Sequence, residues 1–384
     1  MKVLMISTDR NIFDEQSAVR MRMVDYGKLF DELHIVVFSQ KKPHVPIKVK
    51  ISENVFAYPT NSFNRWFYIW GAYRLGKKII KKSKDFIVTV QDPFETGFAG
   101  WLISSHFGLG LNLQVHTDFL SSYFVKDSFL NKVRVQIAKF LLTQANSIRV
   151  VSERVKHSLV TKLKIPEQNI MILPIFTDAH KIKATPAVFS LHEKYTEFDF
   201  IILMVGRLEK EKNFPLALKA FSFVVDKHPK TGLVIVGVGS ELDNLREKAS
   251  ELGVQSNVVF EGWQDHLISY YKTADLFLCT SNYEGYGMAL IEAAISGCPI
   301  VSTNVGVLSY VFKNENSALI CNPGDLDCLV AHLLLAREGE KLRFNLKEQA
   351  KKALEDNILS KEEYLERYKN VILNKESLTK DFME

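Results

Sequence analysis

Short apolar runs alternate with longer amphipathic segments along most of the chain. In the first half, runs that predict strands lie near residues 2–7, 33–38, 54–58, 86–90, 111–116, 147–151 and 170–173. Segments with helical spacing fall between most of them, which predicts a parallel sheet covered by helices on both faces. The pattern returns later, with strands expected near 200–206, 232–237, 257–260, 275–279, 299–303 and 318–320. We therefore predict an α/β protein with two doubly wound domains.

The stretch between the two patterns and the end of the chain differ from both. Residues 179–199 lack a clear period, so we interpret them as a linker between a first domain, residues 1–178, and a second domain, residues 200–359. Apolar positions recur at helical spacing after Ser360, so residues 360–384 are expected to hold a C-terminal helix with a frayed end.

Composition narrows the class of protein. Of the 384 residues, 47% are hydrophobic and 24% charged, which is enough for two globular cores. The first seven residues resemble a strand rather than a signal peptide, and no apolar run is long enough to span a membrane. Four cysteines lack the spacing of a metal site: Cys279, Cys298, Cys321 and Cys328. Cys279 lies in an expected buried strand, so we expect a core thiol there, which suits a reducing compartment, the cytoplasm.

The most informative segment runs from Glu284 to Glu292 and reads EGYGMALIE. It joins an expected buried strand, 275–279, to an expected helix that begins at Met288 and is ended by Gly297. Open α/β sheets bind ligands at this edge, and the unpaired N–H groups of a helix N-terminus suit a phosphate. Glu284 is suited to sugar hydroxyls and Glu292 to both hydroxyls of a ribose. The alternative is that Glu284 caps the helix and Glu292 is solvated.

A second segment adds two cations. An expected buried strand ends at Gly206, and Arg207 and Lys212 follow before the next expected helix. Two cations at this spacing are able to hold a diphosphate from one side. The alternative is a solvated basic turn, because two glutamates lie between them.

The order of these segments resembles that of a known family. Five segments follow one another along the second half of the chain. They are Arg207 with Lys212, Gly237-Val-Gly239, Phe260-Glu-Gly262, the Glu284-to-Glu292 element, and Gly297-Cys-Pro299 to Gly306. This order resembles the retaining, nucleotide-sugar-dependent family 4 glycosyltransferases of the GT-B fold. The resemblance is strong over residues 200–325 and looser before them. It implies two Rossmann-like domains facing each other across a cleft, with the donor mainly on the second domain. It also implies that the C-terminal helix of residues 360–384 crosses back to the first domain.

The resemblance also implies roles for individual residues. Arg207 and Lys212 would hold the donor diphosphate and stabilise the leaving group, and Glu284 would contact the donor sugar. Glu292 would bind the ribose, and His116 falls where the family places a histidine near the donor sugar and the acceptor. Further donor contacts are expected from Gly206, Gly285, Tyr286, Gly287, Met288 and Ala289.

Two positions depart from the family pattern. Many members carry a Gly-Gly pair in the first loop, where this chain has Ser17 and Ala18, with Arg20 nearby for an anionic acceptor. Many also carry an acidic residue after the glycine that corresponds to Gly306, where this chain has Val307. These differences affect the expected details of donor and acceptor recognition rather than the fold.

No metal ion and no other cofactor is expected. In the family interpretation the cations Arg207 and Lys212, with the helix amides, carry the diphosphate charge. Asp325 and Asp327 have the spacing of metal ligands, but Asp325 follows Pro-Gly and opens an expected helix, so an N-cap is the better interpretation.

Charge is unevenly divided along the chain. Residues 1–180 hold 25 Lys and Arg against 15 Asp and Glu, a difference of +10; the rest hold 24 against 29, or −5, which gives the net +5. The excess is densest in residues 63–84, where basic and aromatic residues alternate without an acid. An ordinary helix with a solvated basic face and a helix on an anionic membrane surface both stay open. Nucleic-acid binding is disfavoured, because no known module is visible and the second half is acidic.

We therefore expect a retaining, metal-independent glycosyltransferase that moves a sugar from a nucleotide-sugar to a saccharide or lipid-linked acceptor, in the biosynthesis of a cell-surface polysaccharide or glycolipid. Because no carboxylate is clearly placed as a covalent nucleophile, attack from the leaving-group face is favoured. The expected location is the cytoplasm, with contact to the inner face of the membrane. Two other classes stay open: another GT-B enzyme, such as a sugar-phosphate synthase, and a non-catalytic partner subunit that binds the donor.

Overall fold

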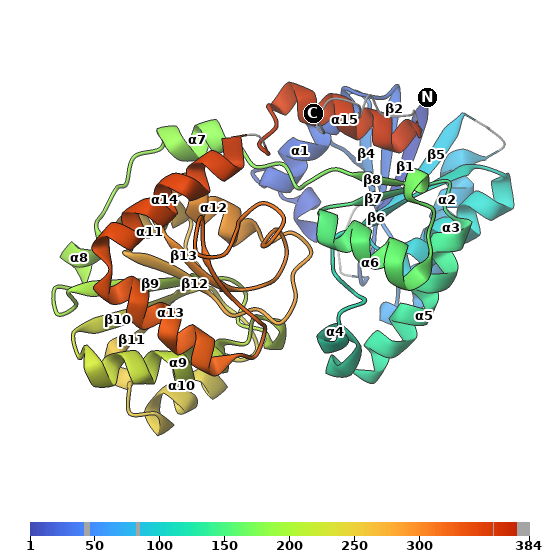
Figure 1. The fold of residues 1–384 in the computed structure, drawn as a ribbon. Coiled ribbons are helices and arrows are strands. Elements are labelled where there is room, and N and C mark those ends of the chain that lie inside the picture. Colours follow the sequence, from blue (N-terminus) through green and yellow to red (C-terminus); the bar gives the residue numbers. More distant parts are fainter. Residues whose placement is uncertain (42–46, 82–84, 356, 375–384) are drawn as a thin grey trace. The chain divides into compact units, whose positions relative to one another are not determined.

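The protein is described from a computed structural model that covers residues 1–41, 47–81, 85–355 and 357–374 (Figure 1). The chain forms two compact units. The N-terminal unit comprises Met1–Pro174 and the chain from Ser360 on, and the C-terminal unit comprises Ile175–Leu359. The expected frayed end and the last three residues of the basic stretch, 82–84, lie outside the described residues.

A mostly parallel sheet of eight strands forms the centre of the described N-terminal unit. The strand order is β3-β4-β2-β1-β5-β6-β7-β8, and only β3 runs antiparallel to its neighbour. The strands are β1 (Lys2–Ser7), β2 (Glu32–Val37), β3 (Val49–Lys50), β4 (Val55–Pro59), β5 (Phe86–Val90), β6 (Gly110–Val115), β7 (Ser147–Val150) and β8 (Ile170–Ile172). The helices are α1 (Ala18–Gly27), α2 (Tyr68–Ile80), α3 (Glu95–Phe107), α4 (Ser122–Asp127), α5 (Phe129–Gln144), α6 (Glu153–Leu163) and α15 (Lys361–Leu373).

Helices cover both faces of this sheet. Leu111 and Leu113 of β6 lie against α3, where glycines at positions 97 and 100 allow a close approach. The alternate residues of the same strand face α15: Asn112 donates to the carbonyl of Val371, and Gln114 donates to the Tyr368 hydroxyl. Because successive side chains of a strand point to opposite faces, α3 and α15 lie on opposite sides of β6.

The C-terminal unit holds a second sheet, entirely parallel over its six described strands. Its strands are β9 (Phe200–Val205), β10 (Thr231–Val236), β11 (Val258–Gly262), β12 (Leu276–Cys279), β13 (Ile300–Thr303) and β14 (Leu319–Cys321), in the order β11-β10-β9-β12-β13-β14. Its helices are α7 (Ala179–Ala184), α8 (Leu191–Lys194), α9 (Phe214–Lys227), α10 (Leu242–Glu251), α11 (Leu267–Thr273), α12 (Met288–Ser296), α13 (Leu326–Glu338) and α14 (Glu340–Glu355). Two parallel α/β domains are thus present, and the predicted fold class is confirmed.

The strand order creates a switch point between β9 and β12. From β9 the chain moves outward to β10 and β11, and then returns to the other side of β9 to form β12. The loops that leave β9 and β12 therefore diverge at the carboxyl edge, which is where open α/β sheets bind ligands. The buried side chains of β9, among them Phe200, Ile202 and Met204, anchor this edge in the core of the unit.

The segment expected to be a linker is ordered into short helices. Residues 179–199 contain α7 and α8, and α7 packs against α12 of the C-terminal unit. The first of the two chain segments that form the N-terminal unit ends at Pro174, four residues before the predicted boundary at residue 178. Among the described helices, none combines the length and hydropathy that crossing a bilayer requires.

Candidate active site

A lysine and a glutamate meet at the switch point of the second sheet. Lys212 ends a short 3-10 turn after β9, and Glu284 lies on the loop after β12. The Lys212 ammonium donates to the Glu284 carboxylate, and the two side chains are only 20% and 17% exposed. Ser281 Oγ donates a second hydrogen bond to the same carboxylate, at 2.9 Å. Two of the residues expected at the donor site are therefore in direct contact.

Hydrogen bonds between the two loops fix this pair. Thr280 Oγ1 donates to the carbonyls of Lys212 and Asn213, each at 3.0 Å. The backbone N–H of Asn282 donates to the Glu211 carbonyl at 2.8 Å, and the Asn213 amide donates to the Asn282 side chain at 3.1 Å. Each loop therefore holds the other, which preorganises the charged pair before any ligand binds.

The pair determines the charge of the lysine. Burial lowers the pKa of Lys212, but the Glu284 carboxylate beside it outweighs that effect, and the net pKa is raised. Lys212 is thus a cation at neutral pH, held by a carboxylate in a partly buried place. Cys279, at the end of β12, lies close to both charges, and burial raises the pKa of its thiol, so it is neutral there.

Arg207 does not join Lys212 in the structure. Its guanidinium pairs with Glu211 at 2.8 Å, and its side chain is 75% exposed. Exposed pairs of this kind contribute about 0–1 kcal/mol, so Arg207 leaves Glu211 at little cost. The expected clamp of two cations is therefore not formed without a ligand, because each cation has its own glutamate.

Two glycines near this edge are explained by backbone contacts. A Cβ on Gly237 would lie 1.9 Å from the Gly206 carbonyl oxygen, and one on Gly239 would lie 2.3 Å from that of Leu208. The loops after β9 and β10 thus approach each other more closely than any other residue type allows. The Gly237-Val-Gly239 motif is accounted for by packing and needs no nucleotide to explain it.

The start of α12 is open. Gly287 precedes the helix with φ of +93°, and no side chain caps it. The alternative that Glu284 caps this helix is therefore wrong. The N–H groups of Met288 and Ala289 belong to the first turn, which a helix cannot pair internally. Together with the helix dipole they favour an anion at this point.

Glu292 is half-buried on the second turn of the same helix. Tyr271 of α11 donates its hydroxyl to the Glu292 carboxylate at 3.0 Å. Burial raises the pKa of both groups. The alternative that Glu292 is simply solvated is therefore wrong. Tyr271 was not expected from the sequence, because nothing in the local pattern links it to a residue 21 positions away.

The N-terminal unit holds the other expected site residues. His116 follows β6, and its Nε2 lies 3.3 Å from the side-chain oxygen of Gln114. Burial, helped by Arg149 and Arg22, lowers the pKa of His116 to about 3, so its imidazole is neutral at physiological pH. A neutral imidazole can both accept and donate a hydrogen bond, which suits a sugar hydroxyl.

Ser17 and Arg20 form the start of α1, at the switch point of the first sheet. Ser17 caps the helix by accepting from the Arg20 N–H at 3.1 Å, and its hydroxyl donates to the Asn11 carbonyl. The Arg20 guanidinium lies 3.7 Å from Glu15, with only 15% of its side chain exposed. Ser17 therefore has a structural role that is sufficient to explain it.

Two of the four cysteines form a disulfide that the sequence did not indicate. Cys321 and Cys328 are joined by a disulfide, whereas Cys279 and Cys298 are free. Six residues separate the pair in the sequence, but β14 and α13 are joined by a tight turn that brings the two ends together. Asp325 caps α13 by accepting from the Cys328 N–H at 3.1 Å, in agreement with the N-cap interpretation.

The second half of the chain is similar to known proteins. Residues 191–353 match the family model of glycosyl transferases group 1. N-acetyl-alpha-D-glucosaminyl L-malate synthase of Bacillus anthracis is 24% identical over 240 residues, which cover 61% of each chain. Mannosylfructose-phosphate synthase of Agrobacterium fabrum is 31% identical over 152 residues, 37% of this chain and 34% of that protein. The matches thus span less than two thirds of these relatives.

The fold is similar to a solved structure over nearly the whole chain. HepE of Anabaena, solved in complex with UDP and glucose, superposes with a TM-score of 0.74 over 97% of this chain and 98% of its own. The sequence identity is 15%, so this likeness concerns the fold. Residues 191–353 therefore resemble the glycosyl transferases group 1, on a chain that has the GT-B fold.

Proposed function

We propose that the protein is a retaining, metal-independent glycosyltransferase that takes a sugar from a nucleoside-diphosphate sugar. The observation that carries this proposal is the contact between Lys212 and Glu284 beside the open N-terminus of α12. It places a cation, a carboxylate and unpaired amides at one switch point, which matches a ligand with an anionic diphosphate and a hydroxylated sugar. The similarity to HepE, solved with UDP and glucose, supports the same ligand class.

Each group has a distinct role in this proposal. Lys212 and the amides of Met288 and Ala289 stabilise the charge that grows on the diphosphate as it leaves. Arg207 moves from Glu211 to the same diphosphate, and Glu292 accepts hydrogen bonds from the ribose. Since these groups supply the positive charge, transfer does not depend on a divalent ion.

Glu284 lies where it accepts hydrogen bonds from the donor sugar. Its carboxylate already accepts from Lys212 and Ser281, so it is fixed in place and is not free to rotate into a nucleophile's position. We therefore propose attack of the acceptor from the side of the leaving group, with a phosphate oxygen taking its proton. His116, neutral at physiological pH, orients a sugar hydroxyl by hydrogen bonds.

Thermal unfolding in a panel of nucleotides tests the donor site. We expect one nucleoside diphosphate, or its sugar conjugate, to raise the Tm equally with Mg²⁺ and with a chelator, because a ligand that binds only the folded state stabilises it. Glu292→Ala should reduce this rise, and Glu251→Ala, an exposed glutamate of α10, should not. A rise that requires Mg²⁺ would refute metal independence, and no rise with any nucleotide would refute the proposed donor.

The anomeric configuration of the product tests the mechanism. Proton NMR of the first product formed from the identified donor should show the configuration of the donor. An inverted product would refute attack from the leaving-group side.

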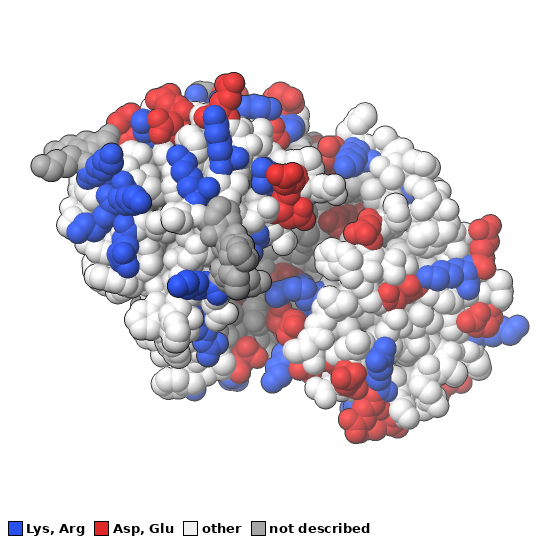
Figure 2. All heavy atoms as spheres, turned by 180° about the vertical axis from the view of Figure 1, so that it is seen from behind, with Lys and Arg blue, Asp and Glu red and all other residues white. Residues whose placement is uncertain are grey.

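The acceptor side of the proposal is a membrane-bound glycolipid or polysaccharide precursor. Aromatic side chains are exposed on and just before α2, including Phe63 at 86% and Trp66 at 76%, followed by exposed Arg74, Lys77 and Lys78. Figure 2 shows that Lys and Arg side chains gather on the N-terminal unit, with few acids between them. Aromatic rings next to cations are typical of helices that lie on anionic lipid.

The exposed apolar surface extends beyond α2. Helix α3 packs against both α2 and α5, so the three helices form a continuous layer. Helix α5 adds Phe129, Leu130 and Phe140 to the exposed side chains of this layer. Exposed apolar side chains on both α2 and α5, with cations on α2, support a contact surface rather than a solvated face.

Vesicle sedimentation tests this surface. The protein should sediment with vesicles that contain anionic lipid and not with neutral ones, and Trp66→Ser with Trp70→Ser should abolish the binding. Phe344→Ser, an exposed aromatic of α14, serves as the matched control. Equal binding of the Trp and Phe variants would refute the membrane surface.

A soluble acceptor is the second candidate. The similarity to mannosylfructose-phosphate synthase favours a sugar phosphate. Turnover of a soluble sugar phosphate in the absence of lipid, at a rate that vesicles do not change, would decide for this candidate.

A further inference from the structure

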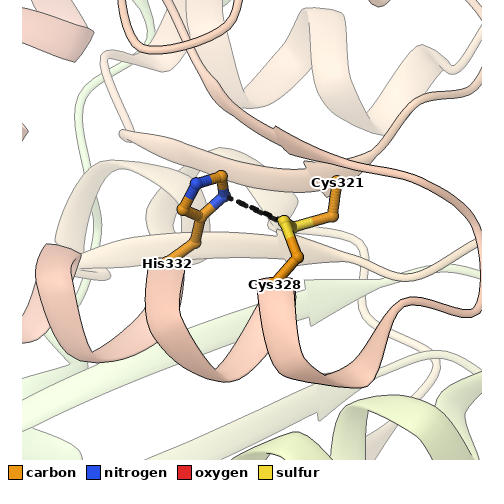
Figure 3. Close-up of side chains that lie close together, drawn as sticks. All are labelled: Cys321, Cys328 and His332. Atoms are coloured by element: carbon orange, nitrogen blue, oxygen red, sulfur yellow. Dashed lines mark hydrogen bonds between the residues drawn. A yellow bond between two sulfur atoms is a disulfide. The ribbon is translucent and has the colours of Figure 1, made fainter.

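A second cluster of chemically active side chains lies in the C-terminal unit. Cys321 ends β14, Cys328 lies in the first turn of α13, and His332 lies one turn later on the same helix (Figure 3). The imidazole Nδ1 lies 3.3 Å from the Cys321 Sγ and 3.8 Å from the Cys328 Sγ. Nothing in the proposed transfer reaction uses these three residues.

The two distances from the imidazole nitrogen to the sulfur atoms are close to those of a tetrahedral metal site. Zinc binds thiolate sulfur at about 2.3 Å and imidazole nitrogen at about 2.0 Å, so a tetrahedron places sulfur and nitrogen about 3.5 Å apart. The observed separations of 3.3 and 3.8 Å lie on either side of this value. The two Cα atoms of the cysteines are 5.8 Å apart, so both sulfur atoms can reach one ion once the bond between them is broken.

We propose that Cys321, Cys328 and His332 form a binding site for zinc or a similar thiophilic divalent ion when the disulfide is reduced. Two thiolates and one imidazole are a common ligand set for zinc. The fourth position is then open to water or to an added ligand. The disulfide and the metal site are two alternative states of the same two sulfur atoms.

The local fold holds the ligands in place without the metal. The Cys321 carbonyl accepts from the Asn304 N–H at 2.7 Å, which ties the end of β14 to the loop after β13. Asp325 fixes the start of α13 through the Cys328 N–H. Residues four positions apart share one face of a helix, so Cys328 and His332 project to the same side.

The exposure of the three side chains is suited to binding from solution. Cys321 is buried, whereas Cys328 and His332 are half-buried. An ion therefore has a path to the site, and one side of the site is closed to water. Cys279 and Cys298 lie on other elements, and neither belongs to such a group of three ligand side chains in the described chain.

Reduction of the disulfide has to precede metal binding. An external dithiol gives two electrons and two protons to the disulfide, which becomes two thiols, and the dithiol becomes a cyclic disulfide. Each thiol then loses its proton when its sulfur binds the ion, and neutral His332 provides a lone pair. Binding of one ion therefore releases two protons to the solvent.

Cobalt binding tests the site, because cobalt replaces zinc and gives a spectrum. The protein is reduced with a dithiol, the reductant is removed without air, and Co²⁺ is added. We expect the charge-transfer bands of cobalt thiolate and the visible bands of tetrahedral cobalt, saturating at one ion per chain. Zinc should remove these bands, and the oxidised protein should show none.

Variants distinguish this site from the other thiols. Cys321→Ser should abolish the bands, His332→Ala should weaken cobalt binding at least tenfold, and Cys298→Ser should bind like the unchanged protein. Reduced protein without thiolate bands, or equal spectra of Cys321→Ser and Cys298→Ser, would overturn the proposal. If Cys321→Ser does not fold, the comparison of oxidised with reduced protein decides, with circular dichroism confirming that both are folded.

Discussion

Replacing Glu284 by glutamine should separate donor binding from sugar transfer. Glutamine keeps the shape of the side chain and still accepts from Lys212 and Ser281, but it carries no charge. In the structure the Lys212 ammonium is neutralised by Glu284, so an incoming diphosphate has to share the lysine with a carboxylate. We therefore expect Glu284→Gln to bind a nucleoside diphosphate more tightly than the unchanged protein while it transfers almost no sugar.

The magnitude follows from the burial of the pair. Two unit charges in contact interact by about 4 kcal/mol at an effective dielectric of about 20. Removing one partner of a buried ion pair lowers the stability of a protein by about 3–5 kcal/mol. The contribution of an exposed ion pair is about 0–1 kcal/mol. With 20% and 17% of the side chains exposed, this pair lies between the two cases. We expect Glu284→Gln to gain roughly 1 kcal/mol, about fivefold, in diphosphate binding.

Lys212→Met gives the opposite expectation. It removes the cation and leaves Glu284 unpaired near the diphosphate, so binding should weaken about 10- to 100-fold, or roughly 1.4–2.8 kcal/mol. Both variants should lose transfer by about 100-fold or more, because the stabilisation of the leaving group and of the sugar is disrupted.

Calorimetric titration with the nucleoside diphosphate, together with a product assay, measures both effects. Glu251→Gln, on the exposed surface of α10, is the matched control and should change neither. Urea unfolding confirms that each variant is folded. If Lys212→Met binds the diphosphate as the unchanged protein does, or if Glu284→Gln weakens binding as much as Lys212→Met, the reasoning is refuted.

Three further outcomes are expected from the structure. Gly306→Ala should lower the unfolding free energy by at least about 2 kcal/mol more than Gly253→Ala. Both glycines have positive φ, but only Gly306→Ala would place a Cβ 2.2 Å from the Tyr286 carbonyl oxygen. Urea unfolding measures the difference, and equal losses of stability would contradict the clash. Burial raises the pKa of Glu292, so the folded state holds this proton more tightly than the unfolded chain, and its contribution to stability is present at low pH and lost as pH rises through the folded-state pKa. Glu292→Gln should therefore raise the Tm above neutral pH but not in acid, while it weakens nucleotide binding; a Tm gain independent of pH would show that another cause is at work. Tyr364→Phe removes hydrogen bonds to Tyr26 and Arg149 and should cost about 1–3 kcal/mol in urea unfolding, whereas Tyr368→Phe, whose contact with Gln114 is 3.4 Å long, should cost less.

Local signals in the sequence are sufficient for most of the elements. The apolar run before Glu284 is β12, and the helix predicted from Met288 to Ser296 is α12 with the same bounds. This helix is predictable because Gly297 adopts a left-handed conformation with φ of +78°, which ends a helix and suits glycine. Such signals act between neighbours and need no knowledge of the tertiary fold.

Pairings across the fold are not predictable in this way. Lys212 and Glu284 are 72 residues apart, and they meet only because β9 and β12 are adjacent in a sheet whose strand order no periodicity reveals. The short helices of residues 179–199 escape notice because each is too short to show a period. Gly237 illustrates the reverse case, since a residue that resembles part of a nucleotide motif is required by a neighbouring backbone.

The return of the chain to its first sheet has a consequence for synthesis on the ribosome. Helix α15 supplies Tyr364 to the buried guanidinium of Arg149 and stacks Tyr368 on Tyr26, with ring centroids 4.0 Å apart. The N-terminal unit is translated first, but its core is complete only after α15 has been synthesised. Residues 175–359 form a continuous unit, which is complete earlier. A premature stop codon shortly before Ser360 would therefore leave the core of the N-terminal unit, which is translated first, without α15. The C-terminal unit, residues 175–359, would still be complete.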